Sequence, residues 1–207
     1  MILAEDTRTA RRLLSHLNIS NRLVSYYSYN EARRIPRVLE ELTRGKQIAL
    51  ISEAGTPLIS DPGHKLVMAA VREGIPVVPI PGASSLLTAL VASGLPTDRF
   101  VFEGFLPRKK GRQTRLRHLA EEEGTIVLFE SAVRIEKTLE DIVKTLGNRY
   151  IVLARELTKV HEEFVRGYAK EVIQQLQSRK LKGEIVLLIA GRSFKPLLNG
   201  DAENDDR

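Results

Sequence analysis

Short apolar runs alternate with amphipathic stretches through the first half of the chain. Each apolar run has the length of a buried strand, and each following stretch repeats its apolar residues at helical spacing. The runs cover residues 1–4, 23–27, 48–51 and 77–80, and the stretches cover 7–17, 31–42, 61–73 and 84–93. This alternation predicts an α/β fold with a mostly parallel sheet covered by helices.

The pattern changes after residues 95–98 (Leu-Pro-Thr-Asp), which read as a hinge. Expected strands cover 100–105, 125–129, 150–155, 162–167 and 184–190, and expected helices cover 108–122, 133–146 and 169–177. We therefore predict two small α/β domains, 1–97 with a mostly parallel sheet and 98–192 with a mixed sheet. The polar residues 193–207 are expected to be a disordered tail. A cleft between the domains is the expected place for a substrate.

Two strand-to-helix loops carry the residues of a ligand site, residues 52–57 and 81–85. Gly55 permits a backbone conformation or close approach that a side chain would block. Asp61 is expected to cap the next helix, with Pro62 at its first position, and Gly82 and Ser84 repeat that design in the second loop. Each loop alone is equally compatible with an ordinary turn. Two of them at the carboxyl ends of neighbouring strands favour a ligand site.

Composition narrows the class of protein. The chain has 207 residues, 43% of them hydrophobic, which is enough for a substantial core. It contains no Cys, and its four His residues lack metal-ligand spacing, so no metal site is expected. No apolar run is long enough to span a membrane, and no signal peptide is recognisable, so a cytoplasmic protein is expected. Neither a G-x-G-x-x-G motif nor a P-loop is present, which argues against a usual dinucleotide or nucleoside triphosphate site.

Positive charge is concentrated in residues 107–117. This stretch holds six Lys or Arg residues and no acid, within a chain of net charge +6. Helical spacing predicts that Arg108, Arg112 and Arg115 share one face. A solvated helix surface is the simple interpretation, but the absence of any acid favours an anionic partner such as RNA. A second basic set is diluted by acids and is equally compatible with either interpretation; it comprises Arg8, Arg11, Arg12, Arg33, Arg34 and Arg37.

Several stretches, in this order and spacing, resemble the ribosomal RNA small-subunit methyltransferase I family, within the tetrapyrrole-methylase-like fold. They are residues 4–8 (AEDTR), 52–57 (SEAGTP), 60–63 (SDPG), 79–82 (PIPG), 94–100 (GLPTDRF), 103–107 (EGFLP), 154–159 (ARELTK) and 182–184 (KGE). The resemblance runs from about residue 2 to 191. It implies an S-adenosylmethionine-dependent enzyme that methylates a cytidine ribose 2′-hydroxyl in 16S rRNA of the small ribosomal subunit. It also implies a homodimer and a cofactor between the two domains.

The resemblance further implies roles for individual residues. Those expected to line the cofactor are Ser52, Glu53, Gly55, Thr56, Ile59, Gly82, Ala83, Ser84, Phe129, Ala154 and Glu184. Asp6, Glu156 or Lys159 could act as the base, and Arg8 could orient a phosphate. The RNA is expected to contact Arg108, Lys109, Lys110, Arg112 and Arg115.

The sequence departs from the family pattern in a few places. Glu53 stands where Asp is usual, Tyr29 stands where His is common, and 131–134 lacks a usual His. Family members begin with a further strand, loop and helix, and this chain begins at the second strand. Two alternatives therefore accompany the rRNA methyltransferase: an enzyme of the same fold that acts on a small macrocycle, and a truncated, non-catalytic binder of cofactor or RNA.

Overall fold

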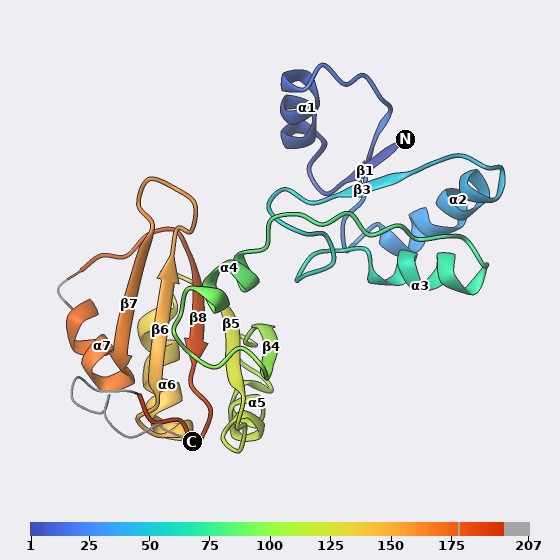
Figure 1. Cartoon of the computed structure of the whole chain (residues 1–207). Helices are drawn as coiled ribbons and strands as arrows, with labels where there is room; N and C mark the ends of the chain where they lie inside the picture. The colour runs from blue at the N-terminus through green and yellow to red at the C-terminus, as the bar shows by residue number, and fades with distance from the viewer. Residues whose placement is uncertain (178, 197–207) are drawn as a thin grey trace, which may run out of the picture. The chain divides into compact units, whose positions relative to one another are not determined.

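The computed structural model describes residues 1–177 and 179–196. The chain divides into two compact units, Met1–Ser84 and Ser85–Arg207, called here the first and the second unit. Each unit contains its own sheet with helices packed on it (Figure 1). The α/β fold class expected from the sequence is confirmed.

The first unit is built on three short parallel strands. β1 (Ile2–Ala4) lies in the middle, between β2 (Leu23–Ser25) and β3 (Ala49–Ile51). Leu3 on the central strand is fully buried, as an apolar side chain between two neighbouring strands should be. The strands bring their carboxyl ends to one edge, where the loops to the helices begin.

Three helices connect and cover these strands. They are α1 (Thr7–His16), α2 (Glu31–Thr43) and α3 (His64–Arg72). α2 and α3 pack against each other, and Val38 and Leu66 from these helices join the core around Leu3 and Tyr26. This packing agrees with the helical spacing of the apolar residues in 31–42 and 61–73, whereas Leu13 of α1 is 50% exposed.

Two predictions for the first unit are wrong. Residues 77–80 form no strand, and Val78 and Ile80 are 75% and 79% exposed. A strand needs a hydrogen-bonded neighbour, and in the described part of the chain the backbone of 77–80 has none. The third helix begins at His64 instead of Asp61, and Gly63, with φ of +136°, stands at its cap.

The second unit contains a five-stranded mixed sheet in the order β4-β5-β8-β6-β7. Its strands are β4 (Phe100–Phe105), β5 (Thr125–Ser131), β6 (Tyr150–Arg155), β7 (Glu163–Tyr168) and β8 (Glu184–Ile189). β4 and β5 are parallel, and the remaining neighbours are antiparallel. The mixed sheet expected for this half of the chain is therefore confirmed.

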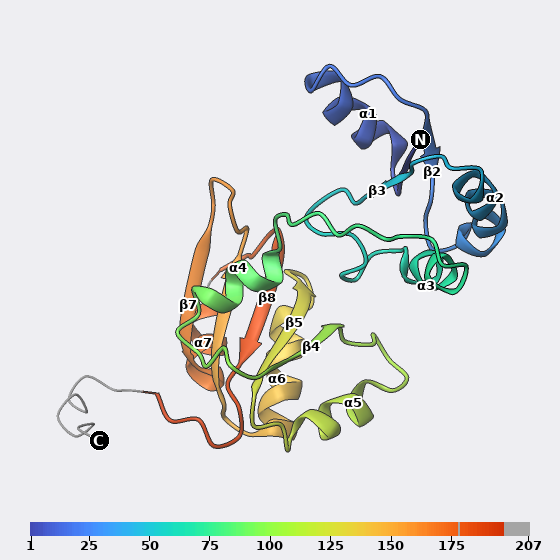
Figure 2. The same cartoon turned by 45° about the vertical axis from the view of Figure 1, so that its right-hand side comes forward.

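Both faces of this sheet are covered. Alternate residues of a strand point to opposite faces, so Ile126 and Leu128 of β5 join one core and Val127 joins the other. α6 (Ile135–Leu146), with α5 (Arg112–Leu119) and α7 (Ala169–Leu176), contributes to the first of these cores, and α4 (Ser85–Val91) contributes to the second. Figures 1 and 2 show α4 and α6 on opposite faces. Of the described helices, none is long and apolar enough to cross a bilayer.

The two units meet earlier in the sequence than the expected boundary at residue 97. The helix α4 belongs to the second unit because Leu86 and Leu90 pack against the strands of that unit. Arg166 of β7 also donates a hydrogen bond of 2.6 Å to the carbonyl of Ala92, just beyond this helix. The apolar face of α4, and not the hinge-like residues after it, determines where the division lies.

The tail expected at 193–207 is ordered at its start. Phe194 packs against the core beneath α4, and its ring centroid lies 6.0 Å from that of Tyr150. The expectation of disorder is therefore wrong for this residue. Residues 197–207 lie outside the described part of the chain.

Candidate functional site

The two loops singled out in the sequence lie side by side. The Thr56 hydroxyl donates a hydrogen bond of 3.0 Å to the carbonyl of Ala83, which joins the first loop to the second. Gly55 has φ of +80°, and a Cβ atom there would lie 3.3 Å from the same carbonyl oxygen. Ser52 closes the first loop through a 2.8 Å hydrogen bond from its hydroxyl to the carbonyl of Gly55. The expected adjacency of these loops is confirmed.

The backbone of both loops has free hydrogen-bonding capacity. Within the described residues, the N–H groups of the non-proline residues in 53–58 and 77–83 donate no hydrogen bond to another part of the protein. Gly55, Gly82 and Ala83 are exposed, so these amides face solvent or a ligand. Unpaired donors arranged on two adjacent loops suit a ligand that carries carboxylate and hydroxyl oxygens.

A buried carboxylate anchors the far end of the first loop. Glu31, at the start of α2, accepts hydrogen bonds from the Gly63 N–H at 3.0 Å and from the Tyr26 hydroxyl at 3.1 Å. The residue is only 6% exposed, and Lys65 lies 3.6 Å from its second oxygen. Burial, together with Glu31, raises the pKa of Tyr26, so its hydroxyl keeps its proton and remains a donor. The sequence pattern did not single out Glu31 as an anchor, because Gly63, which it binds, belongs to a different segment of the chain.

Asp61 lies within the same loop and caps no helix. Burial raises the pKa of its carboxyl, and the adjacent Ser52 hydroxyl acts in the opposite direction. The helix begins three residues later because Gly63 carries the φ of +136° that the chain needs to enter it. Asp61 therefore contributes a partly buried acid to the loop, where the sequence predicted a cap.

Asp6 and Arg8 form a closed pair at the end of β1. Asp6 caps α1 by accepting the Arg8 backbone N–H at 2.7 Å, and it also accepts the Arg8 Nη2 at 2.6 Å. These hydrogen bonds lower the pKa of Asp6 to about 2. A carboxylate with so low a pKa is a weak base, and Arg8 is already occupied by it.

Lys159 joins two acids at the end of β6. Its Nζ lies 2.9 Å from both Glu156 and Glu184. The backbone N–H of Glu184, followed by Lys159, lowers the pKa of Glu156, and Glu184 and Glu156 raise the pKa of Lys159. Lys159 is consequently a protonated bridge and not a base at neutral pH. Glu156 and Thr158 adopt φ of +49° and +64°, which makes this turn one of the strained segments of the chain.

The three cofactor candidates of the second unit lie close to one another. Phe129 of β5 and Ala154 of β6 are both in register with Val186 of β8, one from each side. Glu184 lies two residues before Val186 on the same strand, so its side chain points to the same face. Ala154 is 1% exposed, while Glu184 is exposed. Their contact with a cofactor stays a prediction.

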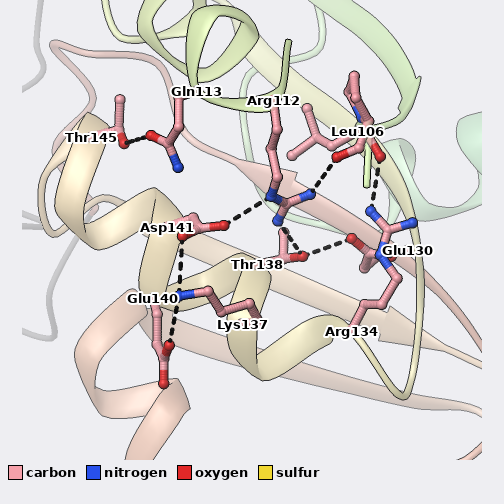
Figure 3. A network of polar contacts seen from close by, with 11 residues as sticks. Leu106, Arg112, Gln113, Glu130, Arg134, Lys137, Thr138, Glu140, Asp141 and Thr145 are labelled. Carbon is pink, nitrogen blue, oxygen red and sulfur yellow. Dashed lines mark hydrogen bonds and ion pairs between the residues drawn. The ribbon is translucent and has the colours of Figure 1, made fainter. Parts of the chain in front are cut away.

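The basic cluster is arranged differently from the expected helix face. Arg108, Lys109 and Lys110 are exposed and precede α5, which begins only at Arg112. Arg112 is 8% exposed and makes hydrogen bonds of 2.8 Å to both Asp141 and Thr138 (Figure 3). The prediction that Arg112 contacts RNA is therefore wrong, because its guanidinium is buried and occupied.

Arg115 remains at the surface but is paired. Its side chain is 54% exposed and forms an ion pair with Glu103 of β4. The expected face shared by Arg108, Arg112 and Arg115 does not exist, since the first precedes the helix and the second points inward. The exposed cations without an ion pair in the described part of this segment are Arg108, Lys109, Lys110 and Arg117.

Comparison with known proteins defines the class to which this fold and these loops belong. The family model "Tetrapyrrole (Corrin/Porphyrin) Methylases" matches residues 1–173. Among solved structures, a cobalamin biosynthetic enzyme, cobalt precorrin-4 methyltransferase, is 17% identical with a TM-score of 0.60, covering 91% of this chain and 82% of that one. Uroporphyrin-III C-methyl transferase from Thermus thermophilus, solved with S-adenyl homocysteine, is 19% identical with a TM-score of 0.56, covering 91% and 96%. The class is therefore a methyltransferase of this fold.

Relatives found by sequence define the family more narrowly. Proteins named "Ribosomal RNA small subunit methyltransferase I" are 46% identical in Halalkalibacterium halodurans, 45% in Thermotoga maritima and 50% in Pasteurella multocida. The matches cover 94%, 93% and 93% of this chain and 68%, 86% and 70% of the three relatives. The chain belongs to the ribosomal RNA small subunit methyltransferase I family. The resemblance inferred from the sequence is thereby confirmed.

Proposed function

We propose that this protein transfers a methyl group from S-adenosylmethionine to a cytidine ribose 2′-hydroxyl of 16S rRNA in the small ribosomal subunit. The observation that carries the proposal is identity of 45–50% to relatives of that name over more than nine-tenths of the chain. The tetrapyrrole methyltransferases among the structural neighbours are under 25% identical and support the fold alone.

The paired loops of the first unit would hold the cofactor. Their free N–H groups suit the carboxylate and ribose oxygens of S-adenosylmethionine, and Gly55 leaves room for a ligand to approach the backbone. When bound, the cofactor supplies an electrophilic methyl group on its sulfonium. The protein's task is to exclude water and to align the hydroxyl with that methyl within about 3–3.5 Å.

The proposed roles of the charged candidates follow from their pairing. Asp6 and Glu156 have lowered pKa values, so each would act mainly by orienting a hydroxyl or a neighbouring cation instead of holding a proton. Lys159 stays protonated between Glu156 and Glu184 and would favour negative charge that develops on the ribose oxygen. Single substitutions at Asp6, Glu156 and Lys159 would show which of them affects kcat.

The RNA would be held by the exposed cations before α5. Arg108, Lys109 and Lys110 are consecutive, exposed and free of ion pairs within the described residues. Lys and Arg side chains bind phosphates without regard to sequence and make binding sensitive to salt. This segment would therefore supply affinity for the small subunit.

A transfer assay tests the proposal directly. The protein is incubated with S-adenosylmethionine labelled in its methyl group and with small ribosomal subunits that lack the modification. Label should appear in 16S rRNA, and alkaline hydrolysis should leave it in a dinucleotide, because a 2′-O-methyl group removes the nucleophile for strand cleavage. Label on a base, or transfer only to a uroporphyrin-type macrocycle, would refute the proposal. Light scattering of the same preparation tests the expectation that the protein forms a homodimer.

A further inference from the structure

We infer that two paired arginines, the buried Arg112 and the partly buried Arg134, act as positioning residues that fix the exposed cations of 108–110 for binding of RNA. The inference rests on the proposed function, since it concerns the surface that would hold the rRNA. Together with Glu130, Thr138 and Asp141, these arginines form a network of polar contacts, which we call the arginine clamp (Figure 3).

The clamp binds the backbone immediately before the basic segment, residues 108–110. Arg134 donates a hydrogen bond of 2.8 Å from Nη2 to the carbonyl of Leu106. Arg112 donates one of 3.3 Å from Nη1 to the carbonyl of Pro107. These two consecutive carbonyls come directly before Arg108. The guanidinium groups of Arg134, at the cap of α6, and of Arg112, in α5, thus bind the backbone immediately before a segment whose own side chains are exposed.

Arg112 is held by an acid and a hydroxyl, and Arg134 is held by an acid. Arg112 donates from Nε to Asp141 and from Nη2 to Thr138, both at 2.8 Å. Thr138 donates onward to Glu130 at 2.7 Å, and Glu130 lies 3.2 Å from Arg134 Nε. Thr138 therefore links the two halves of the clamp.

Burial makes this arrangement stiff. The side chains of Glu130 and Asp141 are 1% and 8% exposed, and that of Arg112 is 10% exposed. Burial opposes ionisation of Asp141, but hydrogen bonds from Arg112 and Lys137 lower its pKa. In surroundings of low dielectric, a guanidinium that loses its carboxylate becomes an unpaired buried charge, which costs more than the pair contributes. Removal of one partner should consequently destabilise the whole clamp.

The basic segment is held at both ends, by this clamp and by the start of α5, where the Arg112 backbone N–H donates a hydrogen bond of 3.3 Å to the carbonyl of Lys109. α5 is fixed by Leu116 and Leu119 in the core, but Gly111, with φ of +85°, separates the helix from the basic segment. Arg108, Lys109 and Lys110 make no ion pair of their own in the described part of the chain. Their backbone is fixed at its start through Leu106 and Pro107, where the arginines bind.

One substitution distinguishes a positioning role of the clamp from a purely electrostatic effect on RNA binding, because the two predict opposite changes in affinity. Asp141→Asn removes a negative charge near the proposed RNA surface, so simple electrostatics predicts tighter binding of a polyanion. If the clamp positions the cations, Asp141→Asn instead weakens binding, because Arg112 loses the carboxylate that holds it. Thr138→Val makes the same test without any change of charge, and Thr138→Ser restores the hydroxyl.

Binding of the full-length variants to unmodified small subunits is measured across a range of salt concentrations. We expect Asp141→Asn and Thr138→Val to bind about tenfold more weakly, comparable to the loss of one or two phosphate contacts. Thr138→Ser should bind like the wild type, and the affinity for S-adenosylmethionine should not change. The double variant Arg108→Gln/Lys110→Gln is the matched control, with a salt slope reduced by roughly 1.5.

A second measurement reports on the segment without RNA. Trypsin cleaves after Arg and Lys, so brief digestion should nick the clamp variants within 108–110 faster than the wild type. Faster nicking with weaker binding supports the clamp. Unchanged nicking, or binding as tight as that of the wild type, overturns it. Failure of the wild type itself to bind or methylate small subunits would refute the proposed function instead, which keeps the two failures distinguishable.

Discussion

Replacing Glu31 with alanine should loosen the cofactor loop from a distance. The carboxylate accepts hydrogen bonds from the Gly63 N–H and from the Tyr26 hydroxyl, at 3.0 and 3.1 Å. Alanine would leave both donors without a partner in a region where Tyr26 is fully buried. The loop 52–63 would lose the contact that fixes its carboxyl end to α2.

The size of the effect follows from these contacts. A hydrogen bond to a charged group contributes about 1.5–3 kcal/mol, so losing two should lower the free energy of unfolding by about 3–6 kcal/mol. The ion pair with Lys65, whose side chain is 61% exposed at 3.6 Å, adds little because solvent screens it. Glutamine keeps an acceptor oxygen, and Glu31→Gln should cost only about 1 kcal/mol.

Urea unfolding followed by far-UV circular dichroism measures the stability of the first unit in each variant. Hydrogen exchange at the Gly63 amide reports on the loop, and calorimetry gives the Kd for S-adenosylmethionine. We expect Glu31→Ala to exchange faster at Gly63 and to bind the cofactor more weakly, with Glu31→Gln close to the wild type. An unfolding free energy for Glu31→Ala within about 0.5 kcal/mol of the wild type would refute the assigned anchoring role.

Three further outcomes are expected. Gly55→Ala should cost about 1 kcal/mol and weaken cofactor binding measured by calorimetry, because its φ is +80° and its Cβ would lie 3.3 Å from the second loop; unchanged binding would contradict this. Arg108→Glu/Lys110→Glu should weaken subunit binding at least tenfold in a filter assay, and charge reversal at the exposed Lys170 should not. Asp6 has its pKa lowered to about 2 from 3.8, so its stabilising contribution is present above about pH 3.8 and disappears as the pH falls toward 2. Asp6→Asn should remove that part of the acid dependence in thermal melts, and an identical pH profile would contradict the pairing.

Local sequence patterns predicted the helices and strands whose apolar residues follow a regular pattern. The helical spacing of apolar residues predicted α2, and the apolar runs predicted β5 and β6. The residues 77–80 show the limit of this reasoning. Their Val and Ile content is typical of a buried strand, but strand formation depends on a neighbour that the composition of the segment does not reveal.

Site residues that are required for their backbone conformation could be predicted from the sequence. Site residues whose role depends on a partner distant in sequence could not. Gly55 was recognisable because its position needs a close approach of the backbone. Arg112 was misassigned because a charge run does not reveal which member turns inward; the acid that captures it, Asp141, is far away in sequence. Glu31 was overlooked for the same reason, since its partner Gly63 belongs to another element.

The placement of β8 has a consequence for the synthesis of the protein. This strand follows the other four strands of its sheet in the sequence, yet it lies in the middle of that sheet, with Ile189 in register with Ile126 on one side and Ile151 on the other. β5 and β6 therefore leave the ribosome before the strand that pairs with both of them. A chain terminated before Glu184 would contain a folded first unit joined to an open sheet, which is a substrate for chaperones and proteases.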